Sequence, residues 1–234
     1  MKRTIGSIAV SLIIINLLGC AYPTSSYVYI PPKKAKYDNE ILVDKPFEVV
    51  WDELVKQLSK SFYVINNIEK ASRIINLSFS TDTPDEYVDC GATTREYGKK
   101  SNKKVSTYKI AEPSFYQSAS RGGELGQFPV VTNVNRETAL EGRVNIFAAP
   151  EGNSTRIVVN CRYVFSVDAS GNYEVRNVIG TVIENGNIPS STTEIVFNTN
   201  QEKKANWGTA GSPEYVSCHS TGKLEQEILD LVRH

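Results

Sequence analysis

The chain has 234 residues, of which 26 are basic and 26 acidic, so its formal net charge is zero. Hydrophobic residues make up 40% and charged residues 22%, a composition too apolar for a disordered chain. The balanced charge argues against nucleic acid as the main partner, because phosphate binding needs a basic excess. With two histidines and four cysteines, the chain has little material for a histidine-rich metal site or a Ser-His-Asp triad.

The first residues are typical of a secretory signal peptide. A basic pair at residues 2–3 is followed by an apolar run over residues 5–18. That run is too short to span a bilayer as a stable helix and has the proportions of a signal-peptide core. It ends in Leu-Leu-Gly-Cys at residues 17–20. These four residues resemble the lipobox of bacterial lipoproteins.

The lipobox resemblance implies that residues 1–19 are removed and that Cys20 carries diacylglycerol as the first residue of the mature chain. Buried acyl chains contribute about 0.8 kcal/mol per methylene, so several chains give stable anchoring. In the same family, Ala21 after the cysteine implies sorting to the outer membrane. The resemblance therefore predicts a lipoprotein of the bacterial outer membrane that faces the periplasm and is held by the lipid on Cys20.

Residues 20–38 follow as a predicted lipidated tether. They contain prolines, serines and lysines with no sustained period, which is typical of a linker. Four of the side chains are more apolar than a spacer needs: Tyr22, Tyr27, Tyr29 and Ile30. Docking of this segment on the folded domain or on a partner is therefore an open alternative.

The clearest periodic pattern predicts a helix over residues 46–60. Its apolar side chains recur at helical spacing and form one stripe: Phe47, Val50, Trp51, Leu54, Val55 and Leu58. A short strand is expected before it, over 40–43. A β-hairpin is expected after it, over 62–68 and 73–80, where apolar and polar residues alternate.

The remaining chain divides into a polar segment and a strand-rich one. Residues 81–135 are predicted to be a long insertion, either partly ordered or functional, because structureless loops of this length are unusual in compact domains. After it the alternation of residues predicts strands and a closing helix: strands over 138–148, 155–167, 173–183 and 193–198, and a helix over 221–232. A Pro-Glu-Gly-Asn turn at 150–153 joins the first two strands.

Three cysteines remain beside Cys20, and an oxidising periplasm favours one disulfide among them. Cys90 and Cys218 lie at the edges of predicted elements, whereas Cys161 lies within an apolar strand face, as buried free thiols do. We therefore predict a Cys90–Cys218 disulfide. In an extended chain the His219 side chain would point away from that of Cys218, so it is poorly placed to activate the Cys218 thiol. The cysteines also lack the spacing of metal ligands. We expect no catalytic, cofactor-binding or metal-binding residues.

Two sets of motifs resemble known lipoproteins. Residues 46–55, followed by Tyr-Val-Ile at 63–65 and Ile-Ile at 74–75, resemble outer-membrane lipoproteins with BamC-like helix-grip domains. Tyr-Val-Asp-Cys-Gly at 87–91 and the C-x-S-T-G-x-L-E pattern at 218–225 look like a group of periplasmic lipoproteins. The BamC-like resemblance covers about residues 40–80. For residues 39–234 as a whole we expect a single α+β, helix-grip-like domain, in which an antiparallel sheet of about five or six strands packs against two helices.

The function expected from these patterns is that of a non-enzymatic interaction or envelope-assembly accessory module with an envelope protein partner. Two other classes remain open. One is a ligand-binding module with a cavity between helix and sheet, lined by Tyr63, Tyr163 and Phe165. The other is a periplasmic hydrolase, which would need a pocket with convergent ionisable groups.

Overall fold

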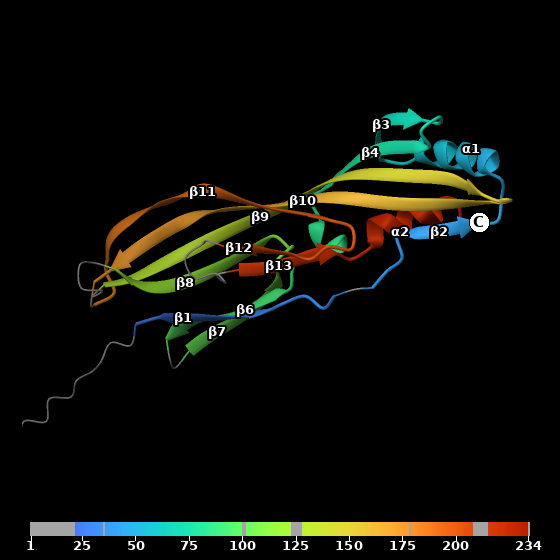
Figure 1. Cartoon of the computed structure of the whole chain (residues 1–234). Coiled ribbons are helices and arrows are strands. Elements are labelled where there is room, and N and C mark those ends of the chain that lie inside the picture. The colour runs from blue at the N-terminus through green and yellow to red at the C-terminus, as the bar shows by residue number, and fades with distance from the viewer. Residues whose placement is uncertain are drawn as a thin grey trace, which may run out of the picture.

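The computed structural model describes residues 22–34, 36–99, 102–122, 128–177, 179–207 and 215–233. It is an elongated molecule built on a few very long strands (Figure 1). Of the described residues, 64% lie in strands and 12% in helices. The protein therefore has a β-rich fold, and the expectation of an α+β helix-grip domain was wrong.

The elements of the described residues follow in this order: β1 (Thr24–Ile30), β2 (Glu40–Val43), α1 (Phe47–Leu58), β3 (Val64–Glu69), β4 (Ile74–Thr81), the 3-10 turn η1 (Pro84–Glu86), β5 (Val88–Asp89), β6 (Ala92–Lys99), β7 (Asn102–Lys109), β8 (Ser114–Gly122), β9 (Phe128–Glu151), β10 (Ser154–Arg176), β11 (Val182–Asn198), β12 (Lys203–Asn206), β13 (Tyr215–Ser220) and α2 (Lys223–Asp230). Neither α-helix in these ranges is long and apolar enough to cross a membrane.

One antiparallel sheet runs the length of the molecule. Its strand order is β11-β10-β9-β4-β3, with β2 paired to β10 and β8 paired to β9. The hairpin of β9 and β10 forms its centre and stays in register from Glu151 opposite Ser154 to Val130 opposite Val175. Buried and exposed side chains alternate along most of both strands, so one face of the sheet is covered and the other faces solvent.

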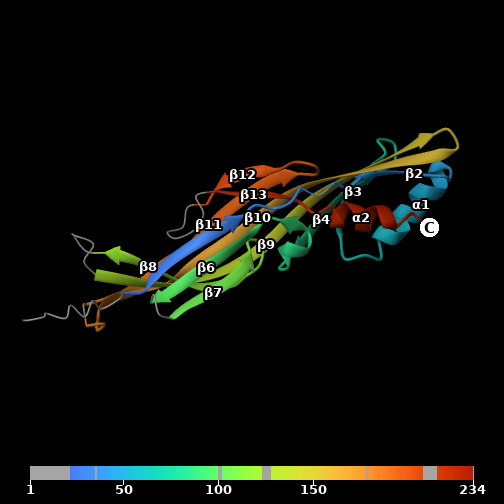
Figure 2. The same cartoon turned by 90° about the horizontal axis from the view of Figure 1, so that it is seen from below.

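At one end, the two helices cover the inner face of this sheet (Figure 2). The stripe of α1 is buried as its spacing predicts, with Trp51 only 4% exposed and Leu54 fully buried. α2 adds Leu224 and Ile228 to the same hydrophobic core. Both predicted helices are therefore present, with slightly narrower bounds than 46–60 and 221–232. We call this end the helical half.

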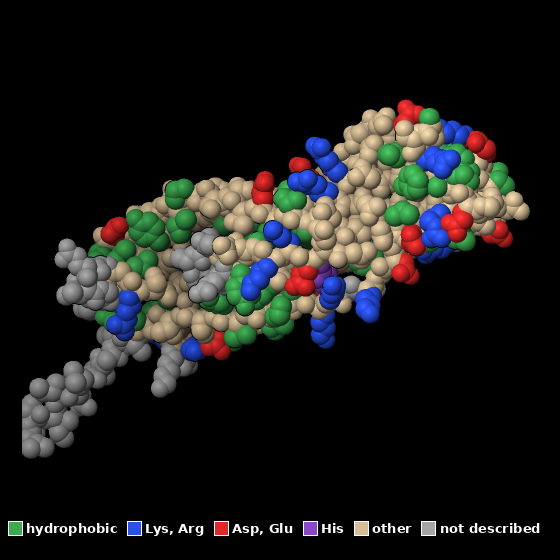
Figure 3. All heavy atoms as spheres, viewed as in Figure 1, with side chains coloured by type: hydrophobic (Ala, Val, Ile, Leu, Met, Phe, Trp, Pro, Cys, Tyr) green, Lys and Arg blue, Asp and Glu red, His purple; other side chains and the backbone are tan. Residues whose placement is uncertain are grey.

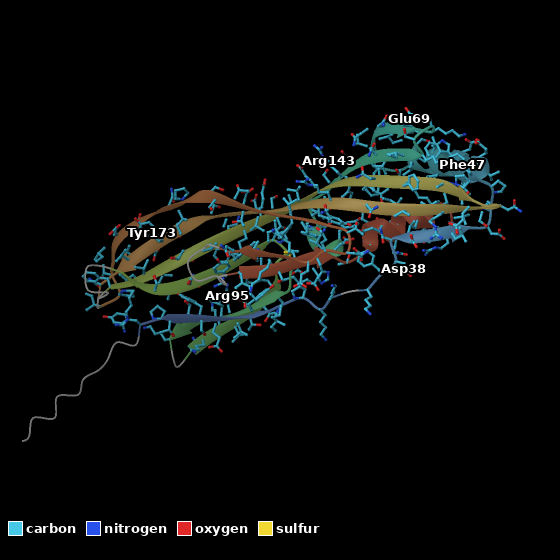
Figure 4. The ribbon with its side chains drawn as sticks, in the orientation of Figure 1. Asp38, Phe47, Glu69, Arg95, Arg143 and Tyr173 are labelled. Carbon is cyan, nitrogen blue, oxygen red and sulfur yellow. A yellow bond between two sulfur atoms is a disulfide. The ribbon has the colours of Figure 1, made fainter. Side chains whose placement is uncertain are left out.

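At the other end, the same face is covered by a second sheet, in the order β1-β6-β7. The interior between the two sheets is aromatic and cationic, with Arg95 lying between them (Figure 4). The Arg95 guanidinium stacks 3.7 Å from the ring centre of Tyr116, and its Nε donates a 2.7 Å hydrogen bond to the Tyr108 hydroxyl. Arg136 is also buried and donates to the Ile110 carbonyl oxygen over 2.8 Å. We call this end the strand half.

The strand half contains most of the segments that the sequence analysis placed outside regular structure. Residues 24–30, expected to belong to a tether over 20–38, form β1, which pairs with β6 from Thr24 opposite Gly98 to Ile30 opposite Ala92. The described residues of the range 81–135, expected to be an insertion, form the end of β4, η1, β5 to β8 and the start of β9. Both segments supply strands that bury polar and aromatic side chains.

Candidate functional site

The predicted disulfide is confirmed. Cys90 and Cys218 form a bond with their Cα atoms 4.1 Å apart, and Cys161 is a buried free cysteine. The bond fastens the chain between β5 and β6 to β13. The predicted lipidation site, Cys20, lies outside the described residues.

The N-terminal strand is fastened to this junction through one side chain. The Tyr29 hydroxyl donates a 3.0 Å hydrogen bond to the Cys90 carbonyl oxygen and accepts a 2.9 Å hydrogen bond from the Ser217 backbone N–H. Burial raises the pKa of Tyr29 above its ordinary value. Residues 20–38 were expected to be a tether, with docking on the domain or on a partner as an alternative. The part that contains Tyr29 is docked on the domain.

A fully buried carboxylate joins α2 to the sheet. Glu225, in the first turn of α2, accepts hydrogen bonds from the Tyr163 hydroxyl over 2.8 Å and from the Thr199 hydroxyl over 2.7 Å. The Ser220 hydroxyl lies 3.2 Å from the same carboxylate. Hydroxyl donors and the helix N-terminus stabilise a negative charge at this depth. These hydrogen bonds join the first turn of α2 to β10, to β13 and to Thr199, and so hold the helix in place.

Among the described residues, Cys161, Cys218 and His219 are the side chains considered above as possible nucleophile or base, and each makes other contacts. The Cys218 sulfur is consumed by the disulfide, and burial, followed by the nearby charge of Glu225, raises the pKa of the Cys161 thiol well above its ordinary value. The two ring nitrogens of His219 lie 2.8 Å and 3.1 Å from the carbonyl oxygens of Ser220 and Lys33. His219 therefore binds backbone and ties the segment after β1 to β13.

Buried tyrosines predict a loss of stability in alkali. Burial, with the charge of Glu227 second, raises the pKa of Tyr63, and burial is also the main cause of the raised pKa of Tyr163. The folded state thus resists their ionisation, so the stability that they provide is complete below about pH 10 and is lost as the pH rises further, by up to about 1.4 kcal/mol per pH unit for each group. Urea unfolding between pH 8 and pH 11 measures this decline.

The matched variant for this prediction is Tyr63→Phe. It keeps the ring and removes the ionisable hydroxyl, which donates a 3.3 Å hydrogen bond to the Glu227 carboxylate. The variant should lose less stability between pH 9 and pH 11 than the unmodified protein. Equal slopes for the two proteins would show that Tyr63 ionises as readily in the folded state as in the unfolded chain.

The sequence analysis considered a ligand cavity between helix and sheet, lined by Tyr63, Tyr163 and Phe165. In the structure these side chains pack into the core. Tyr163 and Phe165 are fully buried, and Tyr63 is 8% exposed, all within the main hydrophobic core. The Tyr163 ring stacks on Phe197 with ring centres 5.4 Å apart. These three residues thus form packing contacts at the place where a ligand was considered.

A hollow of about 640 Å³ lies instead on the outer face of the long sheet. Its walls come from β4, β9 and β10 and from the chain around the start of β3, and include Phe62, Val64, Glu141, Arg143 and Arg162. Phe62 is 69% exposed and Val64 62%, which is unusual for large apolar side chains that lie beside each other. Figure 4 places Arg143 on the side of the sheet opposite α2 and β13.

Strand pairing sets five of the surrounding residues in a line across the sheet. The line follows the register of five neighbouring strands and consists of Val64 (β3), Ser78 (β4), Arg143 (β9), Arg162 (β10) and Asn198 (β11). We call this line the arginine row. Basic side chains project from this upper surface near the middle of the molecule, with hydrophobic atoms beside them (Figure 3).

The arginine row is a feature that the sequence analysis missed, although the sequence contained a clue to it. Arg143 precedes Glu151 by as many residues as Arg162 follows Ser154, and Glu151 and Ser154 close the hairpin whose turn was predicted. Extending the hairpin register outward from that turn places the two arginines opposite each other. Their common exposed face then follows from the alternation along each strand.

A separate cleft of about 500 Å³ opens at the far end of the strand half. Tyr22 and Pro23 line it, together with Tyr97 from β6 and Ile179 from the turn after β10. Arg176 and Glu174 also line it and form an ion pair with each other. Glu174 thus neutralises the charge of Arg176, whereas Arg143 and Arg162 form no ion pair among the described residues; Lys99 adds a further basic side chain to this cleft.

Comparisons of the chain with protein-family models, with curated proteins and with solved structures gave no match. The geometry of the protein itself therefore carries the functional argument. On that basis the hollow with its arginine row is the candidate functional site.

Proposed function

We propose that the protein is an outer-membrane lipoprotein that faces the periplasm and acts as a non-enzymatic interaction or envelope-assembly accessory module. The observation that carries the proposal is the position of the N-terminal segment. β1 begins at Thr24, four residues after the predicted lipidation site at Cys20, and enters the molecule at the end farthest from α1 (Figure 1). A lipid on Cys20 would anchor the strand half and leave the helical half to reach outward.

The outward half also contains the exposed surface that suits a partner. The hollow beside Phe62 and Val64 lies on an uncovered sheet face, next to β3, which is an edge strand of the long sheet. Exposed apolar residues at a sheet edge are features of protein interaction surfaces. An envelope protein is therefore the kind of partner that we propose.

Replacing Cys20 by serine tests the anchor. Without the thiol no diacylglycerol can be attached, so the Cys20→Ser protein should lose its labelled palmitate and move from the membrane to the soluble periplasmic fraction. Cys161→Ala is the matched control and should stay in the membrane. Retention of labelled palmitate by the Cys20→Ser protein would contradict the proposed anchor.

Site-specific crosslinking in cells tests the interaction surface. A photo-crosslinking residue at position 62 should capture an envelope protein, whereas the same residue at position 115 should not. Phe115, on β8 in the strand half, is 63% exposed and therefore comparable with Phe62 in accessibility. Equal capture from both positions, or from neither, would contradict an interaction surface in the helical half.

A further inference from the structure

We propose that the arginine row binds an extended acidic segment of the partner protein, with carboxylates on Arg143 and Arg162 and an apolar side chain against Phe62 and Val64. This inference rests on the proposed function of the protein as an interaction module. It goes further by naming the chemistry of the segment that is recognised.

Two like charges face each other across the outer face of the sheet. Arg143 and Arg162 are directly opposed on neighbouring strands, and both are exposed. Like charges in this position lower the stability of a sheet. Among the described residues, neither guanidinium has a carboxylate oxygen within 4.0 Å, although Glu141 also lines the hollow. A bound carboxylate pair would remove the repulsion, and arginine binds carboxylates with two parallel hydrogen bonds.

The hollowed surface continues beyond the two arginines. Arg162 borders the hollow on one side and a second hollow of about 370 Å³ on the other, which also contains Asn198 and Lys203. The arginine row crosses four gaps between strands, roughly 19 Å at 4.8 Å each. An extended peptide of about six residues covers that span. A single small anion would occupy only the space between the two arginines.

The mixed lining of the hollow favours a peptide over a phosphate-rich surface. The hollow combines its two arginines with Phe62 and Val64, and with the acidic side chain of Glu141. Glu141 would repel a dense array of phosphates, whereas a peptide can place an uncharged residue beside it. The apolar wall suits a side chain rather than a headgroup. Acidic residues at alternate positions of an extended peptide lie on one face about 6.6 Å apart, and the rotatable arginine side chains can span the difference from the strand spacing of about 4.8 Å.

The binding test uses the full-length protein in a mild non-ionic detergent and a fluorescein-labelled peptide of eight residues. The peptide carries glutamate at two alternate positions and phenylalanine two positions before the first of them. A second peptide has glutamine in place of both glutamates. Fluorescence anisotropy should show binding of the glutamate peptide that weakens as salt is raised, and at least about tenfold weaker binding of the glutamine peptide.

The variants assign the binding to the arginine row. Replacing both Arg143 and Arg162 by alanine should weaken the glutamate peptide at least about tenfold. The matched control is Lys56→Ala, which removes an exposed positive charge from α1 and should leave binding unchanged. The double variant should melt no lower than the unmodified protein, because it removes a like-charge pair. A loss of binding can therefore be distinguished from a loss of folding.

Three outcomes would overturn the inference: equal binding of the two peptides, equal binding by the double variant, or arginine-dependent binding of vesicles that contain anionic phospholipid but not of the peptide. The last outcome would assign the row to a lipid surface. Failure of the acidic-segment inference can be distinguished from failure of the proposed function. If position 62 still captures an envelope protein in cells while the peptide does not bind, the interaction module stands and the acidic segment does not.

Discussion

Replacing Cys90 and Cys218 together by alanine should lower the free energy of unfolding by about 2–5 kcal/mol. The disulfide joins residues separated by 128 positions, so its loss restores much conformational freedom to the unfolded chain. In the chain-entropy model a loop of this length is worth nearly 5 kcal/mol, and measured values are often smaller. Urea unfolding followed by circular dichroism gives the difference between the two proteins.

Dithiothreitol provides the control for this experiment. It should lower the urea midpoint of the unmodified protein to nearly that of the double variant, and it should leave the midpoint of the variant itself unchanged. A midpoint of the unmodified protein that is insensitive to complete reduction would show that the bond between β13 and the chain after β5 adds no stability.

Replacing Trp51 by alanine should lower the free energy of unfolding by about 3–5 kcal/mol. Trp51 is 4% exposed between α1 and the sheet, and its ring lies 5.6 Å from that of Phe47, measured between ring centres. The substitution leaves a cavity that the surrounding strands can close only in part. Thermal and urea unfolding measure the change.

Val49→Ala is the matched control on the same helix. Val49 is 54% exposed, so its truncation removes little buried area and should change stability by less than about 0.5 kcal/mol. Equal losses for the two variants would contradict burial of the Trp51 ring as the source of the effect, because alanine is a better helix former than either residue and propensity alone would cause no loss.

The helical half could be predicted from the sequence because its core residues are hydrophobic and recur with a regular period. The stripe of α1 places large apolar residues on one face, and the hairpin of β3 and β4 alternates Ile75, Leu77 and Phe79 inward. Both patterns are strong because burial of such side chains dominates local stability. The cysteine pairing also followed from position, since Cys161 lies in the middle of a buried strand face.

The strand half could not be predicted in the same way, because its interior side chains are those that usually mark surfaces or loops. Thr93, Arg95 and Arg136 are at most 3% exposed, yet each is polar or charged in the sequence. The two arginines stack against tyrosines from other strands, such as Tyr27 and Tyr116 beside Arg95. Hydrophobic alternation is weak there, so β1, β6 and β8 were assigned to tether and insertion.

A turn was missed for a local reason. A strand was expected over 173–183, but the chain reverses between β10 and β11 within that range. The Asn177 side-chain oxygen accepts hydrogen bonds from the backbone N–H groups of Ile179 and Thr181, and Gly180 adopts a positive φ of 91°. Asparagine followed by glycine at this spacing is turn chemistry that the surrounding β-branched residues obscured.

The unbroken course of β9 and β10 through both halves has a consequence for distance. Two continuous, fully described strands join the strand half to the helical half, which restricts swinging of one half against the other. From Phe128 to Arg143, β9 covers roughly 50 Å at 3.4 Å per residue. If the protein is anchored by a lipid as we propose, the length of β9 would set the distance between the bilayer and the arginine row. Partners whose acidic segment lies at that distance would then be favoured.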